Sequence, residues 1–281
     1  MKLVFVTGAS GNVGREVVAA LSRLAVPMII GNRLASPART MDDSSSKHFD
    51  FLDFDTYRNA VMGCSAVFLL RPPAISNTKA TLNRFIDVAR SVGVEQIVFI
   101  SVAGAASNPI VPHHAVEIHL RAGPAAWTIL RPGFFSQNLQ SAYRKDILND
   151  DRVYVPAGNG RVAFVDTRDV AAVAVAALLA PEVHAGQAYT LTGPEALSFM
   201  DVAALLSAGL GRTIHYRPAT AIGYVRHLLN NGLSLPQALV QTVLHIGIRF
   251  GQAAAVDPTL ARMLDRAPLT MRDYIRDYRT V

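Results

Sequence analysis

The chain has 281 residues, of which 51% are hydrophobic and 17% charged, and its formal net charge is +6. This composition supports a large buried core and excludes intrinsic disorder. No apolar run reaches the roughly 18 residues of a membrane span, the start does not read as a signal peptide, and one cysteine, Cys64, excludes an internal disulfide framework. We therefore expect a cytoplasmic protein with no membrane association.

Most of the positive charge comes from arginine, because only four of the 27 cations are lysines. The arginines are scattered, and no dense basic tract or aromatic-basic motif accompanies them. Scattered charge is typical of a solvated surface that helps to attract phosphorylated ligands. We expect no nucleic-acid partner.

Strand-like and helical segments alternate through the first half of the chain. Short apolar runs predict strands at 2–6, 27–31, 66–70, 96–101 and 127–131, with helices at 14–24, 56–62, 78–92 and 112–122. Strands of this kind are typical of a sheet covered on both faces. The pattern predicts an α/β fold with a Rossmann-type doubly wound parallel sheet.

The alternation becomes less regular after Pro132. We expect helices at 136–148, 167–179 and 198–209, short strands at 161–165, 188–191 and 213–217, and mostly helix from 219 onward. This predicts a dinucleotide-binding core over residues 1–135. Residues 136–281 would form a smaller, mostly helical substrate-side region, with the strands at 161–165 and 188–191 returning to the core.

A glycine-rich turn follows the first strand and carries the strongest functional signal. It reads T-G-A-S-G-N-V-G and leads directly into a helix. Its glycines would allow a tight turn, close approach of a pyrophosphate and close helix–strand packing, while the helix N-terminus offers N–H groups to phosphates. An ordinary glycine-rich turn is the alternative. The predicted cradle comprises Thr7, Gly8, Ser10, Gly11, Asn12, Val13 and Gly14.

The end of the second strand favours NADP(H) over NAD(H). Asn32 and Arg33 stand there, Arg39 follows, and no acidic residue occurs before Asp42. A planar guanidinium binds the 2′-phosphate of NADP well, whereas NAD sites use a carboxylate on the ribose. A surface arginine is the alternative interpretation of Arg33.

Asp50 and Phe51 follow the expected third strand and are further candidate cofactor contacts. Asp50 could accept a hydrogen bond from the adenine amino group. A simple loop carboxylate is the alternative.

Three later segments extend the pattern: G-V-E-Q-I-V-F-I-S at 93–101, E-I-H-L-R-A-G-P-A-A-W-T-I-L-R-P-G-F-F-S-Q-N-L at 117–139, and G-Q-A-Y-T-L-T-G-P-E-A-L-S at 186–198. Together with the glycine turn, they make the chain resemble the short-chain dehydrogenase/reductase superfamily, and within it the atypical NmrA-like branch. The resemblance spans nearly the whole chain. That branch includes NADPH-dependent quinone, azo-dye and triphenylmethane-dye reductases as well as non-catalytic NADP-sensing regulators, and the long helical C-terminus is more similar to the reductases.

The resemblance implies further site residues at the carboxyl ends of the later strands. The implied cofactor contacts are Leu70, Arg71, Pro72, Ser101, Pro132, Gly133 and Phe134, and the implied substrate-lining residues are Phe135 and Asn138.

The Tyr-x-x-x-Lys pair of ordinary superfamily members is absent, since no lysine follows a tyrosine at that spacing. His113 and His114 occupy the corresponding segment and lie four and three residues before Glu117, so each could share a helix face with it. A carboxylate there could raise the imidazole pKa and create a proton donor near neutral pH. The alternative is that both histidines only pack at the helix start. A metal site is not expected, because His119 faces another side.

These observations predict an NAD(P)H-dependent oxidoreductase that transfers a hydride to a flat, conjugated, apolar acceptor, such as a quinone or a dye-like cation. Such acceptors need little proton donation at the first step, which fits the missing Tyr-Lys pair. The alternatives are a non-catalytic NADP(H) redox sensor that reports to a protein partner, and a biosynthetic reductase of one natural product. A homodimer is a further expectation.

Overall fold

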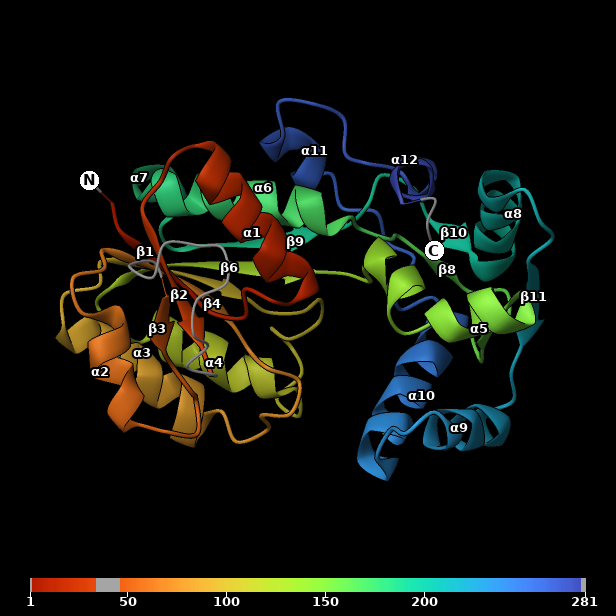
Figure 1. Ribbon diagram of the computed structural model, residues 1–281, viewed down its shortest axis with the longest axis horizontal. Helices are drawn as coiled ribbons and strands as arrows, with labels where there is room; N and C mark the ends of the chain where they lie inside the picture. The colour runs from red at the N-terminus through yellow and green to blue at the C-terminus, as the bar shows by residue number, and fades with distance from the viewer. Residues whose placement is uncertain (1, 34–45, 279–281) are drawn as a thin grey trace. The chain divides into compact units, whose positions relative to one another are not determined.

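The computed structural model describes residues 2–33 and 46–278, and the chain divides into two compact units (Figure 1). The first unit combines Met1–Pro132 with Thr167–Leu191, and the second combines Gly133–Asp166 with Thr192–Val281. The division predicted at residue 135 thus lies close to the first crossing between units. The helix and strand after residue 166 also belong to the first unit.

The first unit contains a seven-stranded sheet with the order β3-β2-β1-β4-β5-β6-β9, in which every neighbouring pair is parallel. The order reverses at β1 and β4, and ligands of such sheets bind at the carboxyl ends of the strands near this reversal. The predicted doubly wound parallel sheet is therefore confirmed. Its strands are β1 (Val4–Val6), β2 (Met28–Asn32), β3 (Ser46–His48), β4 (Ala66–Leu70), β5 (Gln96–Ile100), β6 (Ala126–Pro132) and β9 (Gln187–Leu191).

Helices cover both faces of this sheet, which explains why its central strands β1, β4 and β5 read as apolar runs (Figure 1). One face carries α1 (Asn12–Arg23) and α6 (Thr167–Leu179), with the short α7 (Pro181–His184) after them. The other face carries α2 (Asp55–Val61), α3 (Arg84–Ser91) and α4 (Pro112–Arg121). Alternate strand residues on that second face pack into an aromatic core formed with Phe49, Phe51, Tyr57 and Phe85.

The second unit has two small sheets instead of one large sheet. The strand β7 (Arg152–Val155) pairs in parallel with β11 (His215–Pro218), and β8 (Arg161–Val162) pairs antiparallel with β10 (Leu197–Ser198). The segment at 161–165 therefore does not return to the core sheet as predicted. Its partner is β10 of its own unit, because Gly193 lets the chain before β10 approach the backbone of Phe164 so closely that a Cβ would overlap it.

Helices make up most of the regular secondary structure of the second unit. They are α5 (Arg144–Asp150), α8 (Phe199–Leu210), α9 (Ala221–Asn230), α10 (Leu235–Arg249), α11 (Thr259–Met263) and α12 (Met271–Asp277). Ser198 caps α8 through a capping box with Asp201, as its position before the apolar run predicts. No helix within the described residues is both long enough and apolar enough to cross a membrane.

Two of the predicted helices differ from the structure in the type of helix with which they begin. The helix expected at 78–92 starts with a π-helical turn (Lys79–Asn83), and that expected at 136–148 is a 3-10 helix (Ser136–Gln140) followed by α5. The sequence interpretation missed β7, because its buried Val153 and Val155 give an alternating pattern only four residues long.

Candidate functional site

The turn between β1 and α1 has a backbone that requires glycine at two positions. Gly8 has a φ of +66°, and a Cβ there would lie 2.8 Å from Cδ2 of Leu70. A Cβ on Gly14 would overlap the carbonyl oxygen of Gly8. A Cβ on Gly11 would lie 3.3 Å from the carbonyl oxygen of Gly8, a tight contact that would require a small shift of the turn. This geometry agrees with the predicted tight turn at Gly8 and close packing at Gly14, whereas the approach of a pyrophosphate at Gly11 stays a prediction.

The first turn of α1 is open to an anion. Gly11 is the N-cap residue, no side chain caps the helix, and no acidic residue lies in its first turn. The N–H groups there and the helix dipole favour a phosphate. Ser10 is exposed and Asn12 half-buried, whereas Val13 is in the core and offers only its backbone. These residues fit the pyrophosphate of a dinucleotide.

Thr7 holds this cradle in place. Its buried hydroxyl accepts a hydrogen bond from the backbone N–H of Leu70 (2.8 Å) and donates to the carbonyl of Phe68 (3.2 Å). The Thr7 side chain and the backbone of β4 therefore join the ends of β1 and β4. Thr7 would therefore act on a ligand only by holding the turn in position.

Arg33 follows β2 directly and is exposed. Because β2 pairs with β1, its carboxyl end lies beside the cradle, where this fold places the adenosine ribose. The carbonyl of Asn32 accepts a hydrogen bond from the Phe49 N–H (2.9 Å). Arg39 and Asp42 lie outside the described residues.

Asp50 and Phe51 have structural partners in the first unit. The Asp50 carboxylate accepts a hydrogen bond from the Leu52 N–H (2.9 Å), which closes a tight turn and matches the loop-carboxylate alternative. Phe51 is 4% exposed, and its ring packs edge-to-face on Phe49 with centroids 4.8 Å apart. The Phe51 side chain thus belongs to the core, and only its backbone is available to a cofactor.

Arg71 and Pro72 follow β4, and the Arg71 guanidinium is held by several partners. Its Nη1 donates to the carbonyls of Pro72 (3.1 Å) and Ile75 (2.5 Å), and its Nε donates to Nε2 of His113 (3.2 Å). Partial burial lowers the pKa of Arg71 from its usual value. The segment that the resemblance implies as a cofactor contact therefore also carries a positively charged side chain that is held in place.

His113 is buried and neutral. Burial first, and then the charge of Arg71, lower the pKa of His113 to about 4, and the smaller opposing effect of Glu117 does not reverse this. Since Nε2 accepts the Arg71 N–H, the proton of the neutral ring sits on Nδ1, which is buried without a hydrogen-bond partner among the described residues. The predicted rise in the imidazole pKa is therefore wrong, because burial and the charge of Arg71 outweigh the effect of the Glu117 carboxylate.

Glu117 forms a closed cluster with Arg131 and Ser101. Arg131 donates through Nε (3.0 Å) and Nη2 (2.5 Å), and the Ser101 hydroxyl donates at 2.6 Å. Burial alone would raise the pKa of Glu117, but these hydrogen bonds and the charge of Arg131 outweigh it and lower the pKa. With Glu117 2% and Ser101 1% exposed, the cluster ties α4 to β5 and β6. Sequence reasoning missed Arg131, although an arginine in a buried strand signals a paired charge.

His114 and His119 have separate partners. His114 donates from Nδ1 to the carbonyl of Ala105 (2.8 Å), and His119 contacts Asp87 at the surface (2.7 Å). His114 therefore fits the packing alternative, because its bond fixes the loop after β5 against the start of α4.

Gly133 and Phe134 follow Pro132, the last residue of β6, and belong to the second unit. The Phe134 ring lies 6.0 Å from that of His245, and Phe135 forms a bridge with Val165. Asn138 is half-buried in the 3-10 helix.

His245 is a buried polar residue that sequence reasoning did not single out. It donates from Nδ1 to the carbonyl of Gln241 (2.7 Å), so its Nε2 accepts from the Tyr143 hydroxyl (2.7 Å). Burial lowers the pKa of His245. Its position inside an apolar helix gave no sequence signal.

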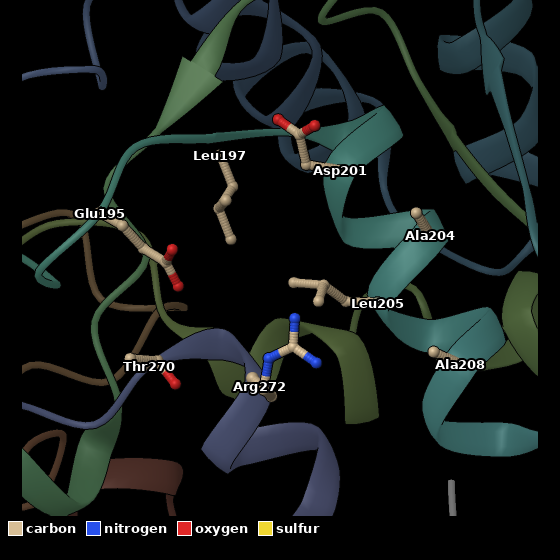
Figure 2. A pocket seen from close by; sticks show the side chains of 8 residues that line it. All are labelled: Glu195, Leu197, Asp201, Ala204, Leu205, Ala208, Thr270 and Arg272. Carbon is tan, nitrogen blue, oxygen red and sulfur yellow. The ribbon is translucent and has the colours of Figure 1, made fainter.

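A cavity of about 610 Å³ lies within the second unit (Figure 2). The side chains of Leu197, Leu205 and Arg272 point into it, and the carboxylates of Glu195 and Asp201 lie at its edge. Asp201 is engaged in capping α8, and Thr270 in capping α12. The polar lining is thus largely helix-capping chemistry and contains no nucleophile–base pair.

Several known proteins are similar to this chain in sequence and in fold. An NAD(P)H azoreductase from Xenophilus azovorans is 33% identical over 279 residues, which cover 95% of this chain and 92% of that protein. The Citrobacter sp. triphenylmethane reductase, in a crystal structure with NADP(H), has a TM-score of 0.84 at 23% identity and covers 99% of both chains. The NADPH-dependent quinone oxidoreductase QOR2 from Escherichia coli, complexed with NADPH, has a TM-score of 0.84 at 22% identity, over 98% of this chain and 99% of that one.

The two solved structures support the fold, and the sequence relatives include, besides the azoreductase, an agroclavine dehydrogenase from Claviceps fusiformis that is 27% identical over 99% of this chain and 98% of that protein. The family model that describes NmrA-like proteins matches residues 1–280. The chain therefore belongs to the NmrA-like family.

Proposed function

We propose that the protein is an NADPH-dependent reductase that delivers a hydride to a conjugated, apolar acceptor of the quinone or azo type. The observation that carries this proposal is the glycine turn, which leads into a helix N-terminus with no side-chain cap and no acidic residue in its first turn. The likeness over 95% of the chain to an azoreductase supports the same activity.

The residues of this chain would bind and orient the cofactor. The first turn of α1 would hold the pyrophosphate, and Arg33 would bind the 2′-phosphate at the end of β2. Bound NADPH supplies the hydride. The neutral His113 cannot act as an acid at neutral pH, so the proton that completes the reduction would come from water.

Turnover can be tested directly with the purified protein. Oxidation of NADPH would be followed against a panel of neutral quinones, azo dyes and triphenylmethane dyes. We expect turnover with at least one acceptor. Measurable NADPH binding without turnover of any acceptor would contradict the proposal and favour the alternative of a redox sensor.

Cofactor choice can be tested at Arg33. We expect Arg33→Ala to raise the Kd for NADPH about tenfold, equivalent to about 1.4 kcal/mol, and to leave the Kd for NADH nearly unchanged. Arg23→Ala, which removes another exposed arginine from the far end of α1, is the matched control. If Arg33→Ala and Arg23→Ala each bound NADPH and NADH with equal affinity, the role of Arg33 would be refuted.

A further inference from the structure

The guanidinium of Arg71 is a fixed cation without a counter-ion. Its Nε and Nη1 are bound to His113 and to backbone carbonyls, which holds the plane of the group in one orientation. Within residues 2–33 and 46–278, its Nη2 has no hydrogen-bond partner and no carboxylate forms an ion pair with it. The residue is partly exposed, so two N–H donors and a full positive charge remain available to a ligand.

Arg71 lies at the edge of the sheet where ligands bind. It follows β4, the strand beside β1, and the preceding Leu70 lies against Gly8 of the cradle. Its contact with His113 reaches the first turn of α4. The cation therefore sits between the cradle and the segment that holds the catalytic pair in ordinary superfamily members.

The polar groups at the end of β5, in β6 and at the start of α4 already have partners. Arg131 is neutralised by Glu117, and the Ser101 hydroxyl is bound to the same carboxylate. The acceptor nitrogen of His113 is used by Arg71. Between the ends of β4 and β6, Arg71 is thus the uncompensated charge of the described structure.

We propose that Arg71 stabilises the negative charge that forms on an acceptor atom during reduction, and that the site therefore prefers neutral quinones and azo compounds to cationic dyes. This inference rests on the proposed function. In the step, a C–H bond of the reduced nicotinamide breaks, and the hydrogen passes with its electron pair to the acceptor. The nicotinamide is oxidised, a neutral acceptor becomes an anion, and a proton from water completes the reduction.

The physical basis is electrostatic pre-organisation. A donor already held in place stabilises developing charge without reorganising, and it acts most strongly on atoms whose charge becomes more negative. A cationic acceptor gains no such stabilisation, because the hydride makes it neutral, and it is repelled by the guanidinium on binding. Selectivity between the two acceptor classes is thus the expected outcome.

The test compares Arg71→Met and Arg71→Lys with the wild type, using one neutral quinone and one cationic triphenylmethane dye. We expect Arg71→Met to lower kcat/KM for the quinone about 100-fold, as loss of an oxyanion donor does, with NADPH affinity changed less than threefold. Arg71→Lys should lose less activity than Arg71→Met. For the cationic dye, Arg71→Met should equal or exceed the wild type.

The control is Arg58→Met, which removes an exposed arginine on α2 and should leave both activities unchanged. Quinone turnover by Arg71→Met within threefold of wild type, with NADPH still bound, would overturn the role of Arg71 while leaving the proposed function intact. Absence of turnover by the wild type with every acceptor would instead overturn the proposed function, and this inference with it.

A binding measurement keeps the inference testable if Arg71→Met is poorly folded. A nitrophenol, whose ionised form is coloured, serves as a probe of anion stabilisation in the NADP-bound protein. We expect bound nitrophenol to ionise at lower pH in the wild type than in Arg71→Lys, because the fork and its fixed donors are lost in the variant. Identical ionisation curves in the two proteins would contradict the inference.

Discussion

Two arginines lie near the carboxyl ends of strands in the same parallel sheet, and they differ in whether a carboxylate pairs with them. Arg131, in β6, is matched by the buried carboxylate of Glu117 and contributes to a closed cluster. Arg71, after β4, contacts only neutral partners among the described residues. One fold thus holds the same side chain in two ways: Arg131 joins β6 to α4 through an ion pair, whereas Arg71 has no carboxylate partner among the described residues, and we propose that its charge serves a ligand.

The largest predicted effect concerns the closed side. Replacement of Glu117 by Leu leaves the Arg131 guanidinium in a buried site without its partner, and we expect a loss of about 3–5 kcal/mol in the free energy of unfolding. Urea unfolding would measure it. Glu182→Leu, at an exposed position, is the control, and the double variant Glu117→Leu/Arg131→Met should recover much of the loss. A single variant as stable as wild type would remove the distinction between the two arginines.

The next effect depends on pH and on His113. Because the pKa of His113 falls to about 4 in the folded protein, the unfolded chain binds a proton at this residue between pH 6.5 and 4 and the folded chain does not. Stability should therefore be complete above pH 6.5 and decrease as the pH falls towards 4, by about 3 kcal/mol.

The measurement compares urea unfolding of wild type and His113→Phe at pH 7 and pH 4.5. The pH-dependent loss should be smaller in the variant, and His114→Phe serves as the neighbouring control. Equal losses in wild type and His113→Phe would show that Arg71 and burial do not hold the ring neutral.

A smaller effect concerns the open side. Gly11→Ala should lower NADPH affinity about tenfold by obstructing the phosphates, and it should destabilise the turn slightly, because the added Cβ would lie 3.3 Å from the carbonyl oxygen of Gly8. Calorimetric titration would measure the affinity. Gly63→Ala removes a glycine far along the chain from the cradle and serves as a comparison for general backbone effects on NADPH affinity. Undiminished affinity of Gly11→Ala would mean that the phosphates do not approach this turn.

The smallest effect concerns an exposed ion pair. Asp87→Asn removes the partner of His119 at the surface, and we expect a change of less than about 1 kcal/mol in the free energy of unfolding at pH 6. A loss of stability as large as that of Glu117→Leu would show that the exposed pair contributes as much to the free energy of unfolding as the buried pair.

The central strands β1, β4 and β5 were predictable because they are buried on both faces and read as apolar runs, whereas β3 (Ser46–His48) is polar and partly exposed. The glycine cradle was predictable for a related reason, since the close packing at Gly14 and the positive φ at Gly8 leave few other residues allowed. Both depend on local sequence and on the backbone.

The chemistry of α4 was not predictable from spacing. His113 and Glu117 share a helix face, but Glu117 pairs with Arg131 fourteen residues later, and Arg71 reaches His113 from 42 residues earlier. Helical periodicity identifies which neighbours could meet, whereas the sign of a pKa shift depends on long-range partners and burial. β7 was missed for a simpler reason, because four alternating residues are too short a pattern.

The division of the chain between its units has a consequence for synthesis. The chain leaves the first unit after Pro132 and returns for Thr167–Leu191, which supplies α6 and the edge strand β9. As the polypeptide emerges from the ribosome, the sheet and the layer beside α1 stay incomplete until residue 191 has been made. A fragment that ends at Pro132 would therefore expose the apolar face that α6 covers and should aggregate, although it contains the entire nucleotide cradle.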